Sequence, residues 1–353
     1  MIRHLKLENF RNYSKYSIEL GKTTVLIGKN GIGKTNILEA VTLISFGRSF
    51  REDDRKRLIN LDSDWSRVVL DDYEIFMQKH PRLLTSIKQR GVNKRMSQIV
   101  GQLPSVVFSP ETLDIITGEP SERRRFMDIA ISQTDRGYLK NLSNYTKIRR
   151  QRNKLLERVS EGIAGEGELD YWDEQLSALG DSITTKRQET MEQLSQKIAQ
   201  YYKTISGQKK ANVSIEYHAK SGGDLRQKLL EHRRTELAQK STVFGPHRDD
   251  LVFKINNMDM AHYASRGETR SAILALKVAE LDYIESERKK YPEVYDQEAH
   301  PLLLLDDVYS EFDADRREHL AELIANYQTL ITTTDLDHLS ADLIKKAKVV
   351  ELK

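Results

Sequence analysis

The sequence contains no cysteine among its 353 residues. This absence excludes disulfide scaffolds, thiol catalysis, cysteine zinc sites and iron–sulfur clusters. Long hydrophobic runs are also missing, because apolar stretches such as Leu302 to Leu305 are far shorter than the roughly 20 residues of a membrane span. The N-terminal segment lacks the basic flank and apolar core of a secretion signal. We therefore expect a cytoplasmic protein without a membrane segment.

A large excess of one charge is missing as well. The formal net charge is +3, with hydrophobic residues at 38% and charged residues at 31% of the chain. This balance is typical of a folded chain with long solvated helices. Because a net charge near zero does not identify a polyanionic partner, the distribution of charge along the chain carries that information instead.

Strand and helix signals alternate at both ends of the chain, whereas helix signals dominate its middle. Strand-like alternation occurs in residues 2–27, and short strands with charged turns fill a β-rich region at about 60–110. The pattern predicts an α/β fold in which residues 1–122 and 241–353 form one discontinuous domain. Residues 123–240 form a helical lobe inserted in that domain.

Residues 28–35 read Gly-Lys-Asn-Gly-Ile-Gly-Lys-Thr, a complete G-x-x-x-x-G-K-[ST] phosphate loop between a predicted strand and a predicted helix. In such a loop the backbone amides turn onto phosphates, and the following helix adds the positive end of its dipole. Lys34 is expected to reach the β and γ phosphates, and the Thr35 hydroxyl to bind Mg²⁺. The alternative, a glycine turn that caps a helix by chance, is disfavoured by the flanking elements. The predicted nucleotide-binding residues are Gly28, Lys29, Asn30, Gly31, Ile32, Gly33, Lys34 and Thr35.

Four leucines at 302–305 precede two aspartates. A buried parallel strand would deliver Asp306 and Asp307 to the carboxyl edge of a sheet, where ligand sites of α/β proteins lie. Asp306 can then hold Mg²⁺, directly or through water, and Asp307 can orient or deprotonate an attacking water. On its own this pattern more often marks the start of a turn. Its combination with a phosphate loop favours the catalytic interpretation.

Ser265, Gly267 and Glu268 directly precede an apolar helical segment at 272–281. A small polar residue and a glycine at this place form, first of all, a helix N-cap. The functional alternative is a second anion-binding helix start, in which the Ser265 hydroxyl and nearby backbone amides face a γ-phosphate. The sequence order of phosphate loop, serine helix and leucine strand with two aspartates favours this alternative.

That order is the one found in ABC-type ATPases, and several longer segments make the resemblance more specific. The segments are residues 8–13, 30–40, 47–51, 110–118 with Pro120 and 123–128, 245–251, 305–313 and 332–335. Together they resemble the RecF family and span nearly the whole chain. The resemblance implies an ABC-type P-loop ATPase head, with a mixed sheet, a β-rich subregion and an inserted helical lobe.

The resemblance also implies how the motifs work together. Each ATP would be bound by the phosphate loop of one subunit and covered by the Ser265 helix of another, so that ATP drives a head-to-tail homodimer. It implies a weak Mg²⁺-dependent ATPase with Asp307 and Lys34 as catalytic residues. Arg11 would contact a phosphate, although an exposed turn arginine is the alternative. The implied partners are gapped DNA or single-stranded/double-stranded junctions, RecR and, indirectly, RecO and RecA, in gap repair and the SOS response.

Basic residues concentrate between residues 123 and 158, where eleven lysines and arginines accompany three acidic residues. Lys147, Arg150, Lys154 and Arg158 fall at i, i+3, i+7 and i+11, along one stripe of a helix. Such a stripe suits a phosphate backbone and carries no base code, so binding is expected to be sequence-tolerant and salt-sensitive. A solvated basic face is the alternative.

Three other functions stay open on the sequence alone: a nucleotide-switched DNA clamp with negligible hydrolysis, another SMC-like ABC head, and a small-molecule kinase. The insertion between about residues 126 and 240 is too short for a long coiled coil and shows no sustained heptad, which disfavours the SMC-like head. A kinase needs an acceptor pocket and a lid, and it gives Ser265 no role.

Overall fold

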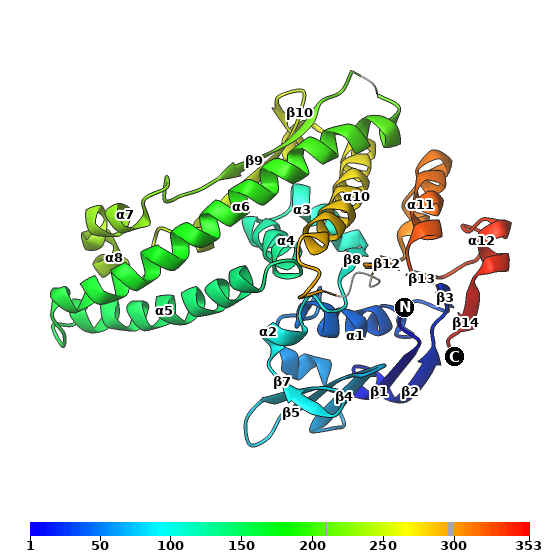
Figure 1. Cartoon of the computed structure of the whole chain (residues 1–353), viewed down its shortest axis with the longest axis horizontal. Coiled ribbons are helices and arrows are strands. Elements are labelled where there is room, and N and C mark those ends of the chain that lie inside the picture. The colour runs from blue at the N-terminus through cyan, green and yellow to red at the C-terminus, as the bar shows by residue number, and fades with distance from the viewer. Residues whose placement is uncertain (209, 296–299) are drawn as a thin grey trace. The chain divides into compact units, whose positions relative to one another are not determined.

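The computed structural model describes residues 1–208, 210–295 and 300–353, and the chain divides into two compact units (Figure 1). The first unit comprises Met1–Leu113, Tyr201–Lys209 and Arg266–Lys353, and the second comprises Asp114–Gln200 and Lys210–Ser265. These boundaries differ from the sequence-based ones, which lay at 122/123 and 240/241. Residues 114–122 and 241–265 belong to the second unit.

The reason for the difference is an antiparallel sheet within the second unit. Its strands are β9 (Val213–His218), β10 (Asp250–Ile255) and β11 (Met258–Asp259), in the order β11-β10-β9. Because β10 pairs along its whole length with β9, which lies inside the predicted helical lobe, residues 241–265 group with that lobe. The second unit is therefore not helical throughout, a feature that its helical periodicity did not predict.

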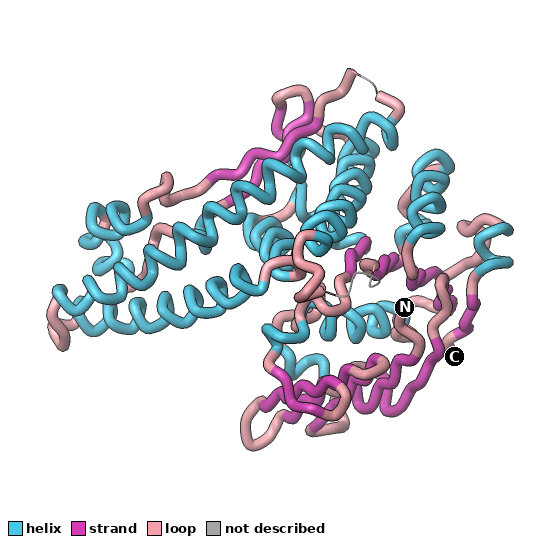
Figure 2. The backbone as a smooth tube through the Cα atoms, viewed as in Figure 1, coloured by secondary structure: helices cyan, strands magenta, loops and turns pink. Residues whose placement is uncertain are grey.

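Helices make up most of the rest of the second unit, as the cyan ribbons in Figure 2 show. They are α3 (Asp114–Thr117), α4 (Pro120–Ser132), α5 (Arg136–Ser160), α6 (Leu169–Ser206, counted with the first unit from Tyr201), α7 (Leu225–Glu231), α8 (Arg233–Gln239) and α9 (Met260–Tyr263). Helix α5 begins after Asp135, whose side chain accepts a hydrogen bond from the Tyr138 amide. Its buried residues include Tyr138, Tyr145 and Leu156.

A parallel sheet forms the centre of the first unit. Its strands are β3 (Thr23–Ile27), β8 (Ser105–Phe108), β12 (Leu302–Asp306), β13 (Thr329–Thr333) and β14 (Lys348–Glu351), in the order β14-β3-β13-β12-β8. The register pairs Ile27 with Thr333 and Asp306 with Thr332, so the carboxyl ends of β3, β13 and β12 lie side by side. This edge is where ligand sites of parallel sheets are expected.

An antiparallel sheet forms the β-rich part of the first unit. Its strands are β1 (His4–Phe10), β2 (Tyr13–Glu19), β4 (Trp65–Leu70), β5 (Tyr73–Gln78), β6 (Leu84–Gln89) and β7 (Val92–Lys94), in the order β2-β1-β4-β5-β6-β7. Helix α1 (Lys34–Phe46) contacts β12 and β13 of the parallel sheet and β1, β4 and β5 of this one. Ile37, Leu38 and Val41 of α1 are consequently fully buried in one hydrophobic core.

The remaining helices of the first unit are α2 (Met96–Ile99), α10 (Arg266–Lys289), α11 (Ala314–Asn326) and α12 (Ala341–Lys346). Short 3₁₀ turns occupy Arg55–Leu58, Pro110–Leu113, Glu166–Glu168, Pro246–Arg248 and Val308–Ser310. Within the described ranges, no helix combines the length and the apolarity that crossing a bilayer requires. The predicted α/β class with a β-rich subregion is confirmed, whereas the central sheet, predicted to be mixed, is parallel throughout.

Candidate nucleotide-binding site

The phosphate loop connects strand β3 to helix α1, as its sequence predicted. Gly33 precedes the helix with a φ of 114°, a left-handed conformation that side chains rarely adopt. A Cβ at Gly33 would also lie 2.7 Å from the Asn12 amide and 2.8 Å from the Tyr13 hydroxyl. The backbone conformation therefore requires glycine at this position, and a side chain here would also displace Asn12 and Tyr13.

Asn12 holds the loop from the side of the antiparallel sheet. Its Nδ2 donates to the Ile32 carbonyl at 2.7 Å, and its Oδ1 accepts from Asn36 Nδ2 at 2.7 Å. Since Asn36 lies in the first turn of α1, Asn12 joins both sides of the loop. Asn12 and Asn36 lie within the segments that carry the family resemblance, but neither was predicted to belong to the site.

Lys34 and Thr35 connect the loop to its surroundings in two directions. The buried Lys34 ammonium donates to the carbonyls of Gly28 at 2.6 Å and Lys29 at 3.0 Å, so it lies inside the loop. Thr35 Oγ1 donates to Asp306 Oδ1 at 2.9 Å. Thr332 Oγ1 donates to the same carboxylate oxygen at 2.6 Å. The two sequence motifs, far apart in the chain, therefore meet at one carboxylate.

The two aspartates lie in different environments. Burial raises the pKa of Asp306, an effect that hydrogen bonds from Thr332 and Thr35 oppose and that Glu111 reinforces. Asp307 adopts a φ of 52°, and its amide donates to Thr332 Oγ1 at 2.9 Å. Burial also raises the pKa of Asp307, against the nearby Lys34 charge. Strand β12 ends at Asp306, and the left-handed conformation of Asp307 turns the chain away from the direction of that strand.

A cavity of about 280 Å³ opens at this edge of the sheet. Its lining residues are Asn30, Gly31, Gly33, Lys34, Thr35, Asn36, Arg51, Pro110, Glu111, Asp306, Asp307 and Thr332. The structure thus brings together most of the predicted loop residues and both predicted aspartates. It adds Arg51, Glu111 and Thr332, which sequence reasoning did not assign. Glu111 follows strand β8, and Thr332 lies near the end of strand β13. Their positions at the carboxyl ends of two predicted strands could have identified both residues.

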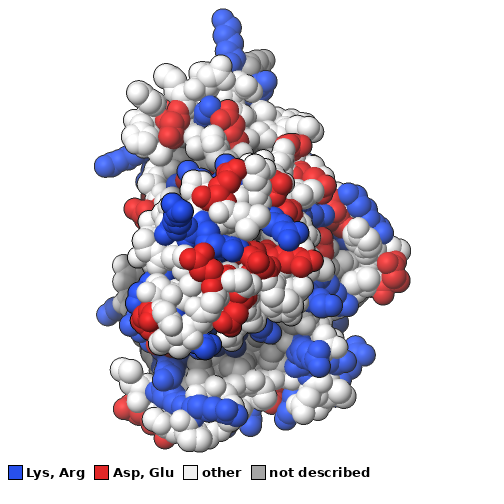
Figure 3. All heavy atoms as spheres, turned by 90° about the vertical axis from the view of Figure 1, so that its left-hand side faces the viewer, with Lys and Arg blue, Asp and Glu red and all other residues white. Residues whose placement is uncertain are grey.

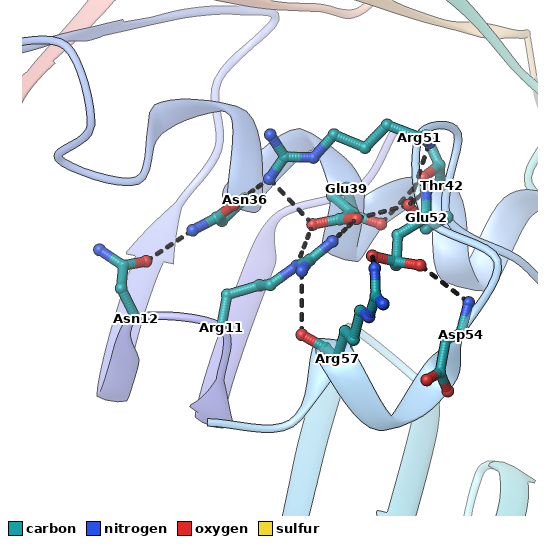
Figure 4. Close-up of polar contacts among 10 residues, drawn as sticks. Arg11, Asn12, Asn36, Glu39, Thr42, Arg51, Glu52, Asp54 and Arg57 are labelled. Carbon is teal, nitrogen blue, oxygen red and sulfur yellow. Dashed lines mark hydrogen bonds and ion pairs between the residues drawn. The ribbon is translucent and has the colours of Figure 1, made fainter. Parts of the chain in front are cut away.

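Arg11, predicted to contact a phosphate, is placed elsewhere. Its guanidinium donates to both carboxylate oxygens of Glu39, at 2.8 and 2.6 Å, and to the Arg57 carbonyl at 2.9 Å (Figure 4). Arg11 is absent from the residues that line the cavity. A contact between Arg11 and a phosphate therefore stays a prediction. In the structure Arg11 is an ion-pair partner of Glu39.

Glu39 is a fully buried carboxylate on helix α1 that forms ion pairs with two arginines. Besides Arg11, it accepts hydrogen bonds from Ser49 Oγ at 2.5 Å and from Arg51 Nη2 at 3.2 Å (Figure 4). Burial alone would raise the pKa of Glu39, but the hydrogen bonds from Arg11 and Ser49 and the charge of Arg51 lower it. Arg51 also contacts Asn36. Glu39 thus holds Arg51 at the wall of the cavity.

The predicted serine helix corresponds to α10, which begins at Arg266, directly after Ser265. The Gly267 carbonyl accepts a hydrogen bond from Arg316 Nη2 at 3.0 Å. Ser265, Gly267 and Glu268 are not among the residues that line the cavity described above. A role of this helix start toward the nucleotide of another subunit stays a prediction.

The predicted basic stripe lies on helix α5. Lys147, Arg150, Lys154 and Arg158 are all exposed. On the face of the molecule shown in Figure 3, lysine and arginine side chains are interspersed with aspartate and glutamate rather than gathered in one large basic patch. Exposure alone is consistent with both interpretations of the stripe, a nucleic-acid contact and a solvated face.

Known proteins match the chain along its whole length. Residues 1–350 match the RecF/RecN/SMC N-terminal domain family. The DNA replication and repair protein RecF of Lachnoclostridium phytofermentans is 35% identical, over 100% of this chain and 98% of its own length. The RecF protein of Oenococcus oeni is also 35% identical, with the same coverage.

Solved structures agree with these matches. A structure of the recombination mediator protein RecF with ATP, in the RecFOR pathway, has a TM-score of 0.85 at 31% identity and covers 95% of this chain and 92% of that one. The Smc head domain of Pyrococcus furiosus covers 100% of this chain and 94% of its own at a TM-score of 0.51 and 16% identity, a likeness of fold alone. With its phosphate loop and strand-end aspartates meeting at one sheet edge, and with relatives of this identity over its full length, the chain belongs to the RecF family.

Proposed function

We propose that the chain is an ATP-dependent, DNA-binding recombination mediator that binds ATP in the cavity between the phosphate loop and strand β12. The observation that carries this proposal is the convergence of Lys34, Thr35 and Asp306, with Thr35 Oγ1 2.9 Å from Asp306 Oδ1. Backbone amides at the start of α1 and the Lys34 ammonium supply positive charge for the triphosphate. The 31% identical RecF bound to ATP supports the same ligand.

The donor set fits Mg²⁺. Magnesium prefers oxygen ligands and usually takes one or two protein carboxylates together with substrate phosphates. Thr35 and Asp306 would hold the ion, and when bound it neutralises charge on the β and γ phosphates. Across the described part of the chain, no group of three or more His, Cys, Asp or Glu side chains forms a closed metal cage. A shared site of this kind therefore suits a metal that arrives with its nucleotide.

Slow hydrolysis is assigned to Asp307. Its carboxylate lines the same cavity and carries a raised pKa, because burial disfavours the charged form. A carboxylate with a raised pKa is a better proton acceptor for an attacking water. Lys34, which lies near Asp307, would stabilise charge on the transferred phosphoryl group.

ATP is proposed to act by joining two copies of the chain head to tail, with the Ser265 helix of one covering the nucleotide of the other. A ligand that binds the dimer more tightly than the monomer favours the dimer by that difference in affinity, and hydrolysis ends the effect. The dimer would act in the cytoplasm on gapped or junction DNA, through basic residues of the second unit. Its proposed protein partners are RecR and, indirectly, RecO and RecA, as the RecFOR pathway of the similar structure suggests.

Nucleotide-dependent binding to gapped DNA tests the proposal. The affinity of the chain for a gapped duplex would be measured with ATP, with ADP and without nucleotide. We expect tight binding with ATP only, and we expect a Lys34→Met variant to show the same weak binding in all three conditions. Equal DNA affinity with and without ATP in the unmodified chain would reject the proposed coupling.

A further inference from the structure

Three arginines in the second unit lie near the half-buried His247. Arg124 lies on α4, Arg149 on α5, and Arg248 in the 3₁₀ turn Pro246–Arg248 beside His247. Among the residues that the structure describes, none of these three arginines forms an ion pair. Arg248 is exposed, and Arg124 and Arg149 are half-buried.

The three carboxylates in this region contact two other arginines. Asp250 pairs with Arg123 at 2.7 Å, and Asp128 pairs with Arg187 at 2.7 Å. Arg187 also lies 3.5 Å from the Asp249 carboxylate, which accepts a hydrogen bond from the amide of Lys220 at 2.9 Å. Three aspartates therefore face five arginines here, so the charge of Arg124, Arg149 and Arg248 is only partly balanced within the unit and a net positive charge remains.

The histidine turn is held rigidly. Tyr145 Oη donates to His247 Nδ1 at 2.8 Å, and His247 Nε2 donates to the Thr242 carbonyl at 3.0 Å. Burial, then the charges of Arg149, Arg248 and Arg124, lower the pKa of His247 to about 3. The neutral ring can then accept at one nitrogen and donate at the other. Because both ring nitrogens are occupied, the turn presents Arg248 from a fixed position.

Two of the arginines have capacity for further hydrogen bonds. Arg149 Nε is buried and has no hydrogen-bond partner. Arg124 donates from Nη1 to the Asp249 carbonyl at 3.0 Å. A buried donor without a partner costs free energy that an anionic ligand would recover. Guanidinium groups match phosphate oxygens in planar, often bidentate geometry, which favours a phosphate ligand over a carboxylate one of equal charge.

We propose that Arg124, Arg149 and Arg248 form a binding site for the phosphodiester backbone of DNA. This inference rests on the proposed function, because it assigns the DNA contact of that function to specific residues. The site holds no base-reading group of its own, so it fixes position on the backbone and not sequence. Its rigid turn and its half-buried Arg124 and Arg149 distinguish it from the exposed stripe on α5.

The two surfaces lie on different sides of α5. Successive residues of an α-helix are about 100° apart, so Arg149 lies about 200° around the axis from Lys147. Arg149 shares its side with the buried Tyr145 and Leu156, whereas Lys147, Arg150, Lys154 and Arg158 lie on the opposite, exposed side. Substitutions can therefore remove one surface and leave the other.

The test compares two double variants that remove the same charge. Arg149→Gln with Arg248→Gln removes the proposed site, and Lys147→Gln with Lys154→Gln removes the stripe. The affinity of each full-length chain for a gapped duplex, with ATP, would be measured between about 50 and 200 mM salt. We expect the arginine variant to lose at least about tenfold in affinity and to lower the salt slope by about 2, and the lysine variant to stay within about twofold.

Several outcomes would overturn the inference. A larger loss in the lysine variant, or no loss in either variant while the unmodified chain binds DNA, would reject the arginine site but leave the proposed function intact. Absence of DNA binding by the unmodified chain would reject both. Stronger competition by polyglutamate than by single-stranded DNA of equal charge would indicate an acidic protein ligand and also reject the site.

A folding control accompanies the comparison. ATP affinity and the thermal unfolding midpoint of the arginine variant are expected to match those of the unmodified chain. If the double variant does not fold, Arg248→Gln alone replaces it, because that side chain is exposed. The single variant should still lose about threefold or more in DNA affinity and lower the salt slope by about 1, and an unchanged slope would reject the site.

Discussion

Thr35 and Asp306 are 271 positions apart in the sequence and are joined by a hydrogen bond of 2.9 Å. Thr35 belongs to the phosphate loop, and Asp306 ends the leucine strand β12. Strand β13 lies between β3 and β12, and its Thr332 donates to the same Asp306 oxygen. The site therefore depends on three neighbouring strand ends, two of which come from the last sixth of the chain.

Replacing Asp306 should separate stability from function. Burial raises the pKa of Asp306, so the folded state binds a proton more tightly than the unfolded state. At a pH above the usual carboxyl pKa, the charged form of Asp306 therefore lowers the free energy of unfolding. We expect Asp306→Asn to raise the thermal midpoint at pH 7 without nucleotide by on the order of 2 °C, while Mg²⁺-dependent ATP binding weakens. Thr332→Val, which removes a hydrogen bond to Asp306, is the control and should lower the midpoint. A lower midpoint for Asp306→Asn would contradict this account.

Replacing Glu39 should destabilise the first unit. Its carboxylate is fully buried, whereas the side chains of Arg11 and Arg51 are 18% and 31% exposed. Because Glu39→Gln leaves two arginines without their counter-charge, we expect a loss of about 3 kcal/mol in the free energy of unfolding. Glu52→Gln is the control, since the partner Arg57 is 71% exposed and such a pair contributes about 1 kcal/mol or less. Urea unfolding with equal midpoints for the two variants would refute the role of Glu39.

His247 should make the free energy of unfolding fall as the pH is lowered. Its folded pKa of about 3 lies below its ordinary value of 6.5, so the unfolded state binds the proton first as the pH falls. Stability is therefore lost from about pH 6.5 downward until about pH 3. Between pH 7 and 5 the unmodified chain should lose up to about 2 kcal/mol more than His247→Gln. The exposed His262→Gln is the control in urea unfolding, and it should follow the unmodified chain.

Asp307 should be needed for turnover and not for ATP binding. Its carboxylate lines the cavity, but the loop and Lys34 supply the positive charge for the triphosphate. We expect Asp307→Asn to lower the ATPase rate by about a hundredfold or more and to retain ATP-bound dimers. The phosphate released at saturating ATP measures this. Equal rates for the variant and the unmodified chain would remove Asp307 from the mechanism and favour a clamp without hydrolysis.

Local sequence patterns predicted most helices and strands, whereas long-range pairing determines which of them contact one another. The phosphate loop and the Asp306–Asp307 pair are contiguous, so the sequence contained them. Arg51 and Thr332 reach the cavity through the Glu39 contact and the β12–β13 register, neither of which has a local signal. Strand β9, by contrast, has a local signal that was missed, because Val213, Ile215 and Tyr217 alternate with polar residues as in a half-buried strand.

The composite site is the central claim, and the mass of the particle in solution tests it most directly. Sedimentation of the unmodified chain should show a larger dimer fraction with ATP than with ADP or without nucleotide. Ser265→Arg should still bind ATP at the phosphate loop, with the weaker affinity of a monomer, and stay monomeric in all three conditions. ATP-dependent dimers of Ser265→Arg at the level of the unmodified chain would contradict the account.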